Sequence, residues 1–229
     1  MSLWVAFAGI LAGVIVWWLA VRRLTTRPWE AQGTADGRDS AGTLGPPPAR
    51  IGLWILLAIL TSLFALFITG YWMRMGHGMA HGLTHDWHPL AEPRVLWINT
   101  VLLALGSVAM QWARGATNRD DPARARLAWW LGGGFAVAFL VGQYYAWQQL
   151  QAAGYYAAAN PANASFYLLT GVHAVHLGGG LVAWIRTAAR MARGGAGLDE
   201  VRLGIELCTV YWHYLLLVWL VLFGLLLQT

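Results

Sequence analysis

The sequence has little charge, a single cysteine and no lysine among its 229 residues. Charged residues make up 11% of the chain, fewer than half of the roughly 25% that soluble domains carry, so it cannot cover a water-facing surface in the usual way. The lone Cys208 excludes a disulfide scaffold and any cysteine-rich metal site, and the lack of a Cys-x-x-Cys-His motif excludes covalent c-type haem. Apolar residues reach 58%, too many for a disordered chain. Together these features indicate an integral membrane protein.

The net charge of +5 does not indicate nucleic-acid binding. All 15 basic residues are arginine, and they lie in short clusters between apolar runs. Such clusters are typical of charge that sets membrane topology, not of a groove that follows phosphates. We therefore expect no nucleic-acid partner.

Six segments are apolar enough to cross a bilayer, which takes roughly 20 mainly apolar residues. They are Leu3–Ala20, Ile51–Met73, Val95–Trp112, Leu127–Gln148, Ala164–Thr187 and Leu203–Leu227. An open sheet edge cannot face lipid, and the alternating polar positions of a membrane barrel are missing. The sequence therefore predicts an all-α, polytopic membrane bundle of six transmembrane helices.

The distribution of arginine predicts the topology. Thirteen of the 15 arginines follow the first, third and fifth predicted helices, and only Arg74 and Arg94 lie in the other loops. The positive-inside rule then places the arginine-rich loops in the cytoplasm and both termini outside. We expect a multi-pass protein of a bacterial-type inner membrane.

Three regions are predicted along the chain. Residues 1–23 form an N-terminal transmembrane anchor that is retained, because the apolar run lacks a basic start and a clear cleavage site. Residues 24–50, which contain three successive prolines and little apolar content, form a flexible cytoplasmic linker. Residues 51–229 form a five-helix membrane domain. Within it, the glycine runs 132–134 and 178–180 mark seams where helices pack closely.

The few ionisable side chains inside the predicted helices are costly in a bilayer and therefore informative. His173 and His176 share one face of the fifth helix. Glu206 and His213, nearly two turns apart, share one face of the sixth. Three interpretations stay open on the residues alone: a structural hydrogen-bonded network, haem ligation as in a membrane b-type cytochrome, and a metal site made of these four residues.

A second group of histidines follows the second predicted helix: His77, His81, His85 and His88. On a helix, their spacing would place all four rings on one face and make a metal site. Nearby glycines and a proline argue against a stable helix there: Gly76, Gly78, Gly82 and Pro89. The alternative is a solvated loop that binds no metal.

Two stretches of sequence resemble a known family. Residues 165–177 read S-F-Y-L-L-T-G-V-H-A-V-H-L and resemble the F-Y-x-x-T-G-x-H-x-x-H signature of cytochrome c oxidase subunit III, a family of haem–copper oxidase subunits. Glu206, followed by residues 211–214 (Y-W-H-Y) and 218–220 (V-W-L), is similar to the family's E-x-x-x-x-Y-W-H-F-x-x-x-V-W-L motif. Asn99-Thr100 and Gly142-Gln143 resemble two further family positions. The resemblance covers roughly residues 51–227, in order.

The resemblance implies a non-catalytic accessory subunit of a haem–copper terminal oxidase in respiratory electron transport. Members of the family bind no haem or copper, which lie in subunit I, their partner in the complex. They pack against subunit I and hold phospholipid. By resemblance, we expect no cofactor in this chain and no catalytic residue. The matching positions would then form a structural and lipid-contacting network: Asn99, Gln143, Tyr167, Thr170, His173, His176, Glu206, Tyr211, Trp212 and His213.

Three positions depart from the family pattern. Carboxylates that relatives carry in the membrane are absent at the positions that we match to Leu60, Ala146 and Leu216. This divergence keeps alternatives open: a subunit III-like component of a nitric oxide reductase or of a quinol oxidase. A mono-haem or metal-binding membrane electron-transfer protein is a further alternative.

Overall fold

The computed structural model describes residues 48–80, 94–158, 161–193 and 198–227, which contain helices and turns but no strand. The helices are α2 (Pro48–Ala80), α3 (Val95–Thr117), α4 (Pro122–Ala152), α5 (Pro161–Arg193) and α6 (Leu198–Leu226). Each is long and apolar enough to cross a membrane. The all-α class and five of the predicted spans are therefore confirmed. The predicted anchor (residues 1–23) and most of the linker lie outside the described residues.

The helices run past the apolar segments that predicted them, because a helix need not end where the hydrocarbon does. α4 begins at Pro122 and not at Leu127. The Asp121 carboxylate caps it by accepting a hydrogen bond from the backbone N–H of Arg124 at 3.1 Å. Proline suits the first turn of a helix, where no partner exists for a backbone N–H, and α5 also begins at a proline. A polar cap followed by a proline thus sets the start of α4, and a proline opens α5.

Residues in the left-handed backbone conformation follow the ends of two helices. Gly154, after α4, has a φ of +86°, and the N–H of Tyr155 reaches back to the Leu150 carbonyl at 2.9 Å. Asp120, after α3, has a φ of +55°, in a region that aspartate enters more readily than most residues. The turn between α3 and α4 is consequently short.

α2 corrects one expectation about the histidine-rich segment. The helix continues beyond Met73 through Gly76 and Gly78 to Ala80, so the prediction that these two glycines disfavour a helix was wrong. Each glycine costs only about 1 kcal/mol relative to alanine, which a long helix tolerates. His77 therefore lies on helical backbone, while the other three histidines of the segment lie outside the described residues.

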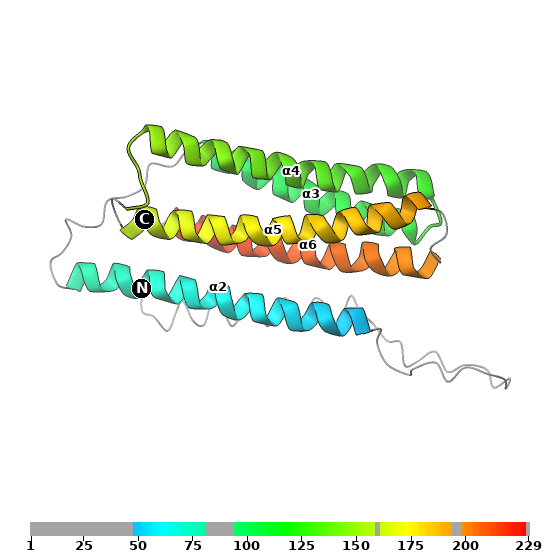
Figure 1. Cartoon of the computed structure of the whole chain (residues 1–229), viewed down its shortest axis with the longest axis horizontal. Helices are drawn as coiled ribbons and strands as arrows, with labels where there is room; N and C mark the ends of the chain where they lie inside the picture. Colours follow the sequence, from blue (N-terminus) through cyan, green and yellow to red (C-terminus); the bar gives the residue numbers. More distant parts are fainter. Residues whose placement is uncertain (1–47, 81–93, 159–160, 194–197, 228–229) are drawn as a thin grey trace. The chain divides into compact units, whose positions relative to one another are not determined.

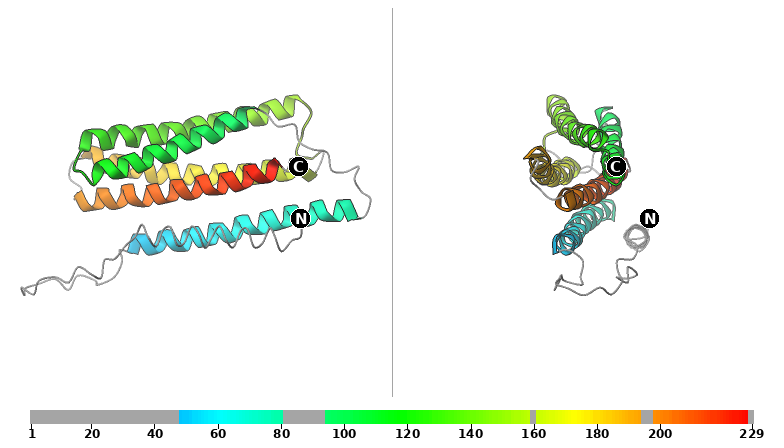
Figure 2. Two further views of the ribbon diagram at one scale, coloured as in Figure 1. Left: turned by 180° about the vertical axis from the view of Figure 1, so that it is seen from behind. Right: turned by 90° about the vertical axis from the view of Figure 1, so that its right-hand side faces the viewer.

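Neighbouring helices alternate in direction. Figures 1 and 2 show α3 to α6 running alongside one another; α3 and α4 pack most closely, and α6 packs against both α3 and α5. α2 reaches the other helices through side chains, such as Thr61, whose hydroxyl lies 3.1 Å from that of Tyr214 on α6. The apolar window of α6 is 61% buried and that of α2 only 22%. α6 is thus the central helix of the described bundle.

The alternation collects arginines at one end of the bundle. This end holds the starts of α2, α4 and α6 and the ends of α3 and α5. It carries Arg50, Arg114, Arg119, Arg124, Arg126, Arg190, Arg193 and Arg202. The opposite end carries Arg74 and Arg94. This is the asymmetry expected from the loops, and the assignment of the arginine-rich end to the cytoplasm stays a prediction.

Small residues let the helix backbones approach. A Cβ atom at Gly132 of α4 would lie 2.7 Å from the sulfur of Met110 on α3, and one at Gly133 would overlap the Trp184 indole of α5. A Cβ at Gly180 of α5 would meet a tyrosine ring of α6 at 2.7 Å. The predicted packing seams are confirmed at these three glycines. The other members of the two runs have open space beside them: Gly134, Gly178 and Gly179.

We predict that Gly133→Ala destabilises the bundle by about 1–3 kcal/mol, because the added methyl group must displace a packed indole. The displaced Trp184 would also lose the hydrogen bond that its Nε1 donates to the Trp129 carbonyl at 3.1 Å. Thermal unfolding in detergent, followed by circular dichroism, measures the effect. Gly134→Ala is the matched control, because that position is open, and its midpoint should not fall. Equal losses in the two variants would contradict the packing described.

Candidate functional site

His173 lies where four helices meet and is fully buried. Its ring centroid, on α5, is 5.4 Å from that of Trp219, 5.8 Å from that of Phe139 and 6.4 Å from that of Phe64. These rings come from α6, α4 and α2. Neither imidazole nitrogen has a hydrogen-bond partner in the described part of the chain. His173 thus packs as one ring in an aromatic cluster.

The other two histidines of the motifs bond to their own helices. Nδ1 of His176 lies 2.7 Å from the Val172 carbonyl, and Nδ1 of His213 lies 2.8 Å from the Thr209 carbonyl. Since a carbonyl only accepts, Nδ1 is the protonated nitrogen in both rings. The hydroxyl of Tyr211 donates to the His176 carbonyl at 3.0 Å, which joins α6 to α5.

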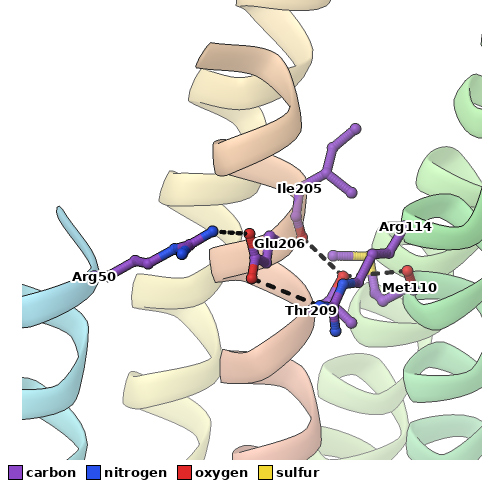
Figure 3. Close-up of polar contacts among 6 residues, drawn as sticks. All are labelled: Arg50, Met110, Arg114, Ile205, Glu206 and Thr209. Atoms are coloured by element: carbon purple, nitrogen blue, oxygen red, sulfur yellow. Dashed lines mark hydrogen bonds and ion pairs between the residues drawn. The ribbon is translucent and has the colours of Figure 1, made fainter. Parts of the chain in front are cut away.

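Glu206 forms a three-helix ion cluster at the arginine-rich end of the bundle (Figure 3). One carboxylate oxygen lies 2.6 Å from Nη2 of Arg50 on α2, and the other lies 3.6 Å from Nη2 of Arg114 on α3. The three side chains are between 22% and 33% exposed. Two cations and one anion leave a positive charge in excess. The cluster therefore joins α2, α3 and α6 through residues that are far apart in the sequence.

The same part of α6 makes a second polar contact with α3. The hydroxyl of Thr209 lies 3.2 Å from the carbonyl of Met110 and 2.7 Å from that of Ile205 (Figure 3). Among the described residues, Glu206 has no hydrogen bond to any histidine. Glu206 and His213 of the motif therefore make separate contacts: Glu206 pairs with two arginines, and His213 bonds to a carbonyl of its own helix.

A buried amide pair joins α3 and α4. Nδ2 of Asn99 donates to Oε1 of Gln143 at 3.2 Å, and both side chains are almost completely buried. Gly142 makes the contact possible, because a Cβ there would overlap Oδ1 of Asn99. The Asn-Thr and Gly-Gln pairs singled out in the sequence thus lie against each other.

Threonine hydroxyls accept hydrogen bonds from two indoles. Nε1 of Trp147 donates to Thr170 at 3.1 Å, and Nε1 of Trp219 donates to Thr100 at 2.9 Å. Each bond joins two helices, α4 to α5 and α6 to α3. Buried polar groups need such partners, because an unpaired one costs roughly 1–3 kcal/mol.

The two remaining motif residues lie apart from these bonds. The hydroxyl of Tyr167 donates to the Tyr155 carbonyl at 2.9 Å and fixes the segment before α5. Trp212 is buried against Gly180, whose Cβ would lie 3.3 Å from the indole. Tyr167 and Trp212 therefore serve packing and loop attachment.

The sequence pattern missed the partners that complete these contacts. Arg50 and Arg114 were counted as charges that set topology, although they are the ion partners of Glu206. Their signal was position, since both lie beside an apolar span. Trp147 gave no signal, because a tryptophan in contact with another helix looks the same in sequence as one at the membrane interface. Trp219 stands in the V-W-L stretch of the second motif, which does not name its threonine partner.

In the described part of the chain, the candidate metal and haem ligands lie against groups other than a shared metal site. No three histidine, cysteine, aspartate or glutamate side chains there lie close enough to share a metal ion. His173 faces aromatic rings, His176 and His213 face helix carbonyls, and Glu206 faces arginines. His81, His85 and His88 lie outside the described residues, as does the side chain of His77.

Comparison with known proteins agrees with the resemblance seen in the motifs. Residues 5–227 match the sequence model of the family described as cytochrome c oxidase subunit III. Cytochrome c oxidase subunit 3 of Thermostichus vulcanus is 28% identical over 200 residues, 86% of this chain and 94% of that protein. The subunit 3 of Synechocystis sp. is 24% identical over 217 residues, 89% and 88% of the two chains.

A third relative is a longer protein. The heme-copper oxidase subunit I+III of Aeropyrum pernix is 26% identical over 180 residues, which cover 77% of this chain and 22% of that one. By its name, that protein carries the two subunits in one chain. The segment similar to this chain is therefore a small part of it.

We predict that His173→Leu changes the stability by less than about 1.5 kcal/mol, because an apolar side chain of similar volume replaces a ring whose nitrogens have no described partner. Thr170→Val, three residues earlier on α5, should cost roughly 1–3 kcal/mol, because it leaves the Trp147 indole N–H unpaired. Thermal unfolding of both variants in detergent gives the comparison. A larger loss for His173→Leu than for Thr170→Val would show that the imidazole has a polar partner.

Proposed function

Because the chain belongs to the cytochrome c oxidase subunit III family, we propose that it is an accessory subunit that stabilises the catalytic subunit of a haem–copper oxidase and binds lipid. The family match over residues 5–227 carries the proposal. The fused subunit I+III of Aeropyrum pernix supports the partner, since fusion joins chains that assemble with each other. In this proposal, haem and copper belong to subunit I, and electron transfer takes place there.

The bonds within the bundle support a structural role. Glu206, Asn99 and Thr170 are each engaged with a neighbouring helix in the described structure. A side chain held in this way positions helices, whereas a proton carrier or a cofactor ligand needs an available atom. The chain then contributes a preformed surface against which a catalytic subunit packs.

Lipid binding is supported by the outer faces of the helices. Large aliphatic side chains are strongly exposed there, such as Leu66 on α2 at 68% and Val175 on α5 at 73%. α2 buries only one narrow stripe against the bundle: Leu57, Leu60, Phe64, Ile68 and Tyr71. Acyl chains suit such faces, because they meet aliphatic side chains without loss of hydrogen bonds.

Because the sequence departs from the family pattern at three positions, a second candidate function stays open. Leu60 and Ala146 are buried, at 4% and 0% exposure, so the membrane interior at these positions is apolar. A subunit without these carboxylates also suits a nitric oxide reductase or a quinol oxidase. The gas consumed by the co-purified complex, oxygen or nitric oxide, distinguishes these possibilities.

We predict that an affinity-tagged chain, extracted from its native membrane in mild detergent, brings a haem–copper catalytic subunit with it. Mass spectrometry identifies the partner, and oxygen consumption reports its activity. Repeated isolation of the chain without any haem-containing subunit would contradict the proposal.

We further predict that Glu206→Ala lowers the yield of assembled complex more than the turnover of each complex that does assemble. The substitution leaves Arg50 and Arg114 without their shared carboxylate, and removing one member of a partly buried ion cluster costs more than removing an exposed pair. The yield comes from co-purification and the turnover from oxygen consumption per haem.

Arg124→Gln is the matched control for this substitution. It removes an exposed ion pair with Asp121 at the same end of the bundle, and exposed pairs contribute at most about 1 kcal/mol. Its yield should stay near that of the wild type. A normal yield with reduced turnover in Glu206→Ala would instead assign the carboxylate to the reaction.

A further inference from the structure

The most buried helix of the described bundle has one open face. The apolar window of α6 is 61% buried, a larger share than in any other described helix. Its open positions recur every three or four residues, which places them on one side of the helix. This His213 face consists of the half-buried Val210 and the exposed His213, Leu217, Leu220 and Val221. The central helix therefore presents a narrow stripe to the surroundings of the bundle.

The His213 face points between α2 and α3. The hydroxyl of Thr209 lies 3.2 Å from a carbonyl of α3, and that of Tyr214 lies 3.1 Å from a hydroxyl of α2. Each residue turns an α-helix by about 100°, so the direction of His213 falls between those of Thr209 and Tyr214. Glu206 bridges the same two helices at the arginine-rich end, where Arg50 and Arg114 approach it from opposite sides (Figure 3). An occupant of this face would therefore meet three helices.

His213 is the polar member of this otherwise aliphatic face. It lies at the middle of the membrane-capable stretch Val201–Leu226, and its side chain is exposed. Nδ1 is bonded to the Thr209 carbonyl at 2.8 Å and carries the proton, which leaves Nε2 as a hydrogen-bond acceptor. No described residue donates to Nε2. Hydrocarbon holds no donor, and polar side chains of spanning helices face protein or water. Acyl chains therefore do not complete this face.

The charge at one end of the His213 face defines the occupant further. Glu206 precedes His213 by seven residues, about 10 Å along the same side of α6. Its ion cluster has one positive charge in excess, on side chains that are 22% to 33% exposed. A carboxylate brought to this end would balance that charge. The matching occupant spans the membrane, with an N–H or O–H donor at mid-depth and a carboxylate at the arginine-rich end, which describes a protein helix and not a lipid.

We propose that the His213 face docks a transmembrane helix of the catalytic subunit, which donates a hydrogen bond to Nε2 of His213 and places a carboxylate beside Arg50 and Arg114. Interhelical hydrogen bonds and close packing are what hold helices together in lipid. Trp97 of α3 extends the apolar contact area, since it is 54% exposed and packs edge-on against Phe223 of α6 at 4.9 Å. The inference rests on the proposed function and names the surface through which the chain carries it out.

Photo-crosslinking in the native membrane tests the docking surface. The photoreactive residue p-benzoylphenylalanine at position 217, one turn from His213, should crosslink to the catalytic subunit. The same probe at position 137 is the matched control, because Val137 is exposed at 49% on the outer face of α4, and it should give no such product. Equal crosslinking at both positions would overturn the proposal. So would products at position 217 that contain only lipid, a second copy of the chain or residues 1–23 of the same chain.

Dissociation of the purified complex after dilution in detergent tests the hydrogen bond. His213→Leu removes the acceptor and should raise the dissociation rate of the catalytic subunit roughly 3- to 20-fold, the range for one interhelical bond in a membrane. His213→Gln keeps an acceptor near the place of Nε2 and should restore most of the retention. Tyr144→Leu, which removes an exposed polar group from α4, should leave the rate unchanged. An unchanged rate in His213→Leu, or no rescue by glutamine, would overturn the proposal.

Mass spectrometry of the crosslinked peptide tests the charge pairing. The partner segment should carry an aspartate or glutamate roughly two helical turns from its donor residue, which matches the separation of Glu206 and His213. A segment without an acidic residue there would overturn the pairing. Retention of the catalytic subunit by the wild type is read in the same sample. A wild type that retains none contradicts the proposed function, whereas retention with crosslinks elsewhere contradicts only the His213 face.

Discussion

Hydrocarbon offers no hydrogen-bond partners, and this constraint governs the chain. Every polar side chain placed in a spanning helix must find a partner within the protein or pay the cost of having none. The indoles of Trp147 and Trp219 meet threonine hydroxyls, and Asn99 meets Gln143. These bonds join helices that have no hydrophobic drive to associate in lipid. The polar residues are therefore few, and most of them fix the arrangement of the bundle.

The ion cluster of Glu206 satisfies the same need for polar partners at the membrane edge. A carboxylate near the bilayer needs a cation, and here two come from helices that are remote in sequence. The cluster matters most for α2, which buries only a narrow stripe and has few backbone approaches to the other helices. Because partial exposure moderates the energy of the cluster, we propose that it selects one placement of α2 and does not supply the bulk of the stability.

Much of this arrangement could be predicted from the sequence, because length and hydropathy determine a spanning helix almost alone. Hydropathy predicted the five spans, the arginines of the loops predicted the arginine-rich end, and the two motifs indicated the family. The pairing of Glu206 could not be predicted, since the position of Arg50 and Arg114 beside apolar spans marks them as near the membrane edge but does not say which carboxylate they meet. The helix ends were also missed, because caps such as Asp121 and the run of α2 through Gly76 depend on local backbone bonds that hydropathy does not record.

In the proposed function, the polar residues of this chain serve structure and assembly, and redox chemistry belongs to its partner. A reduced-minus-oxidised absorption spectrum, with metal analysis, of the chain separated from its purified complex tests this most directly. We predict that the haem bands and the copper remain with the catalytic subunit and that the separated chain shows neither. Stoichiometric haem or metal on the separated chain, lost in a variant of His173, His176 or His213, would contradict it.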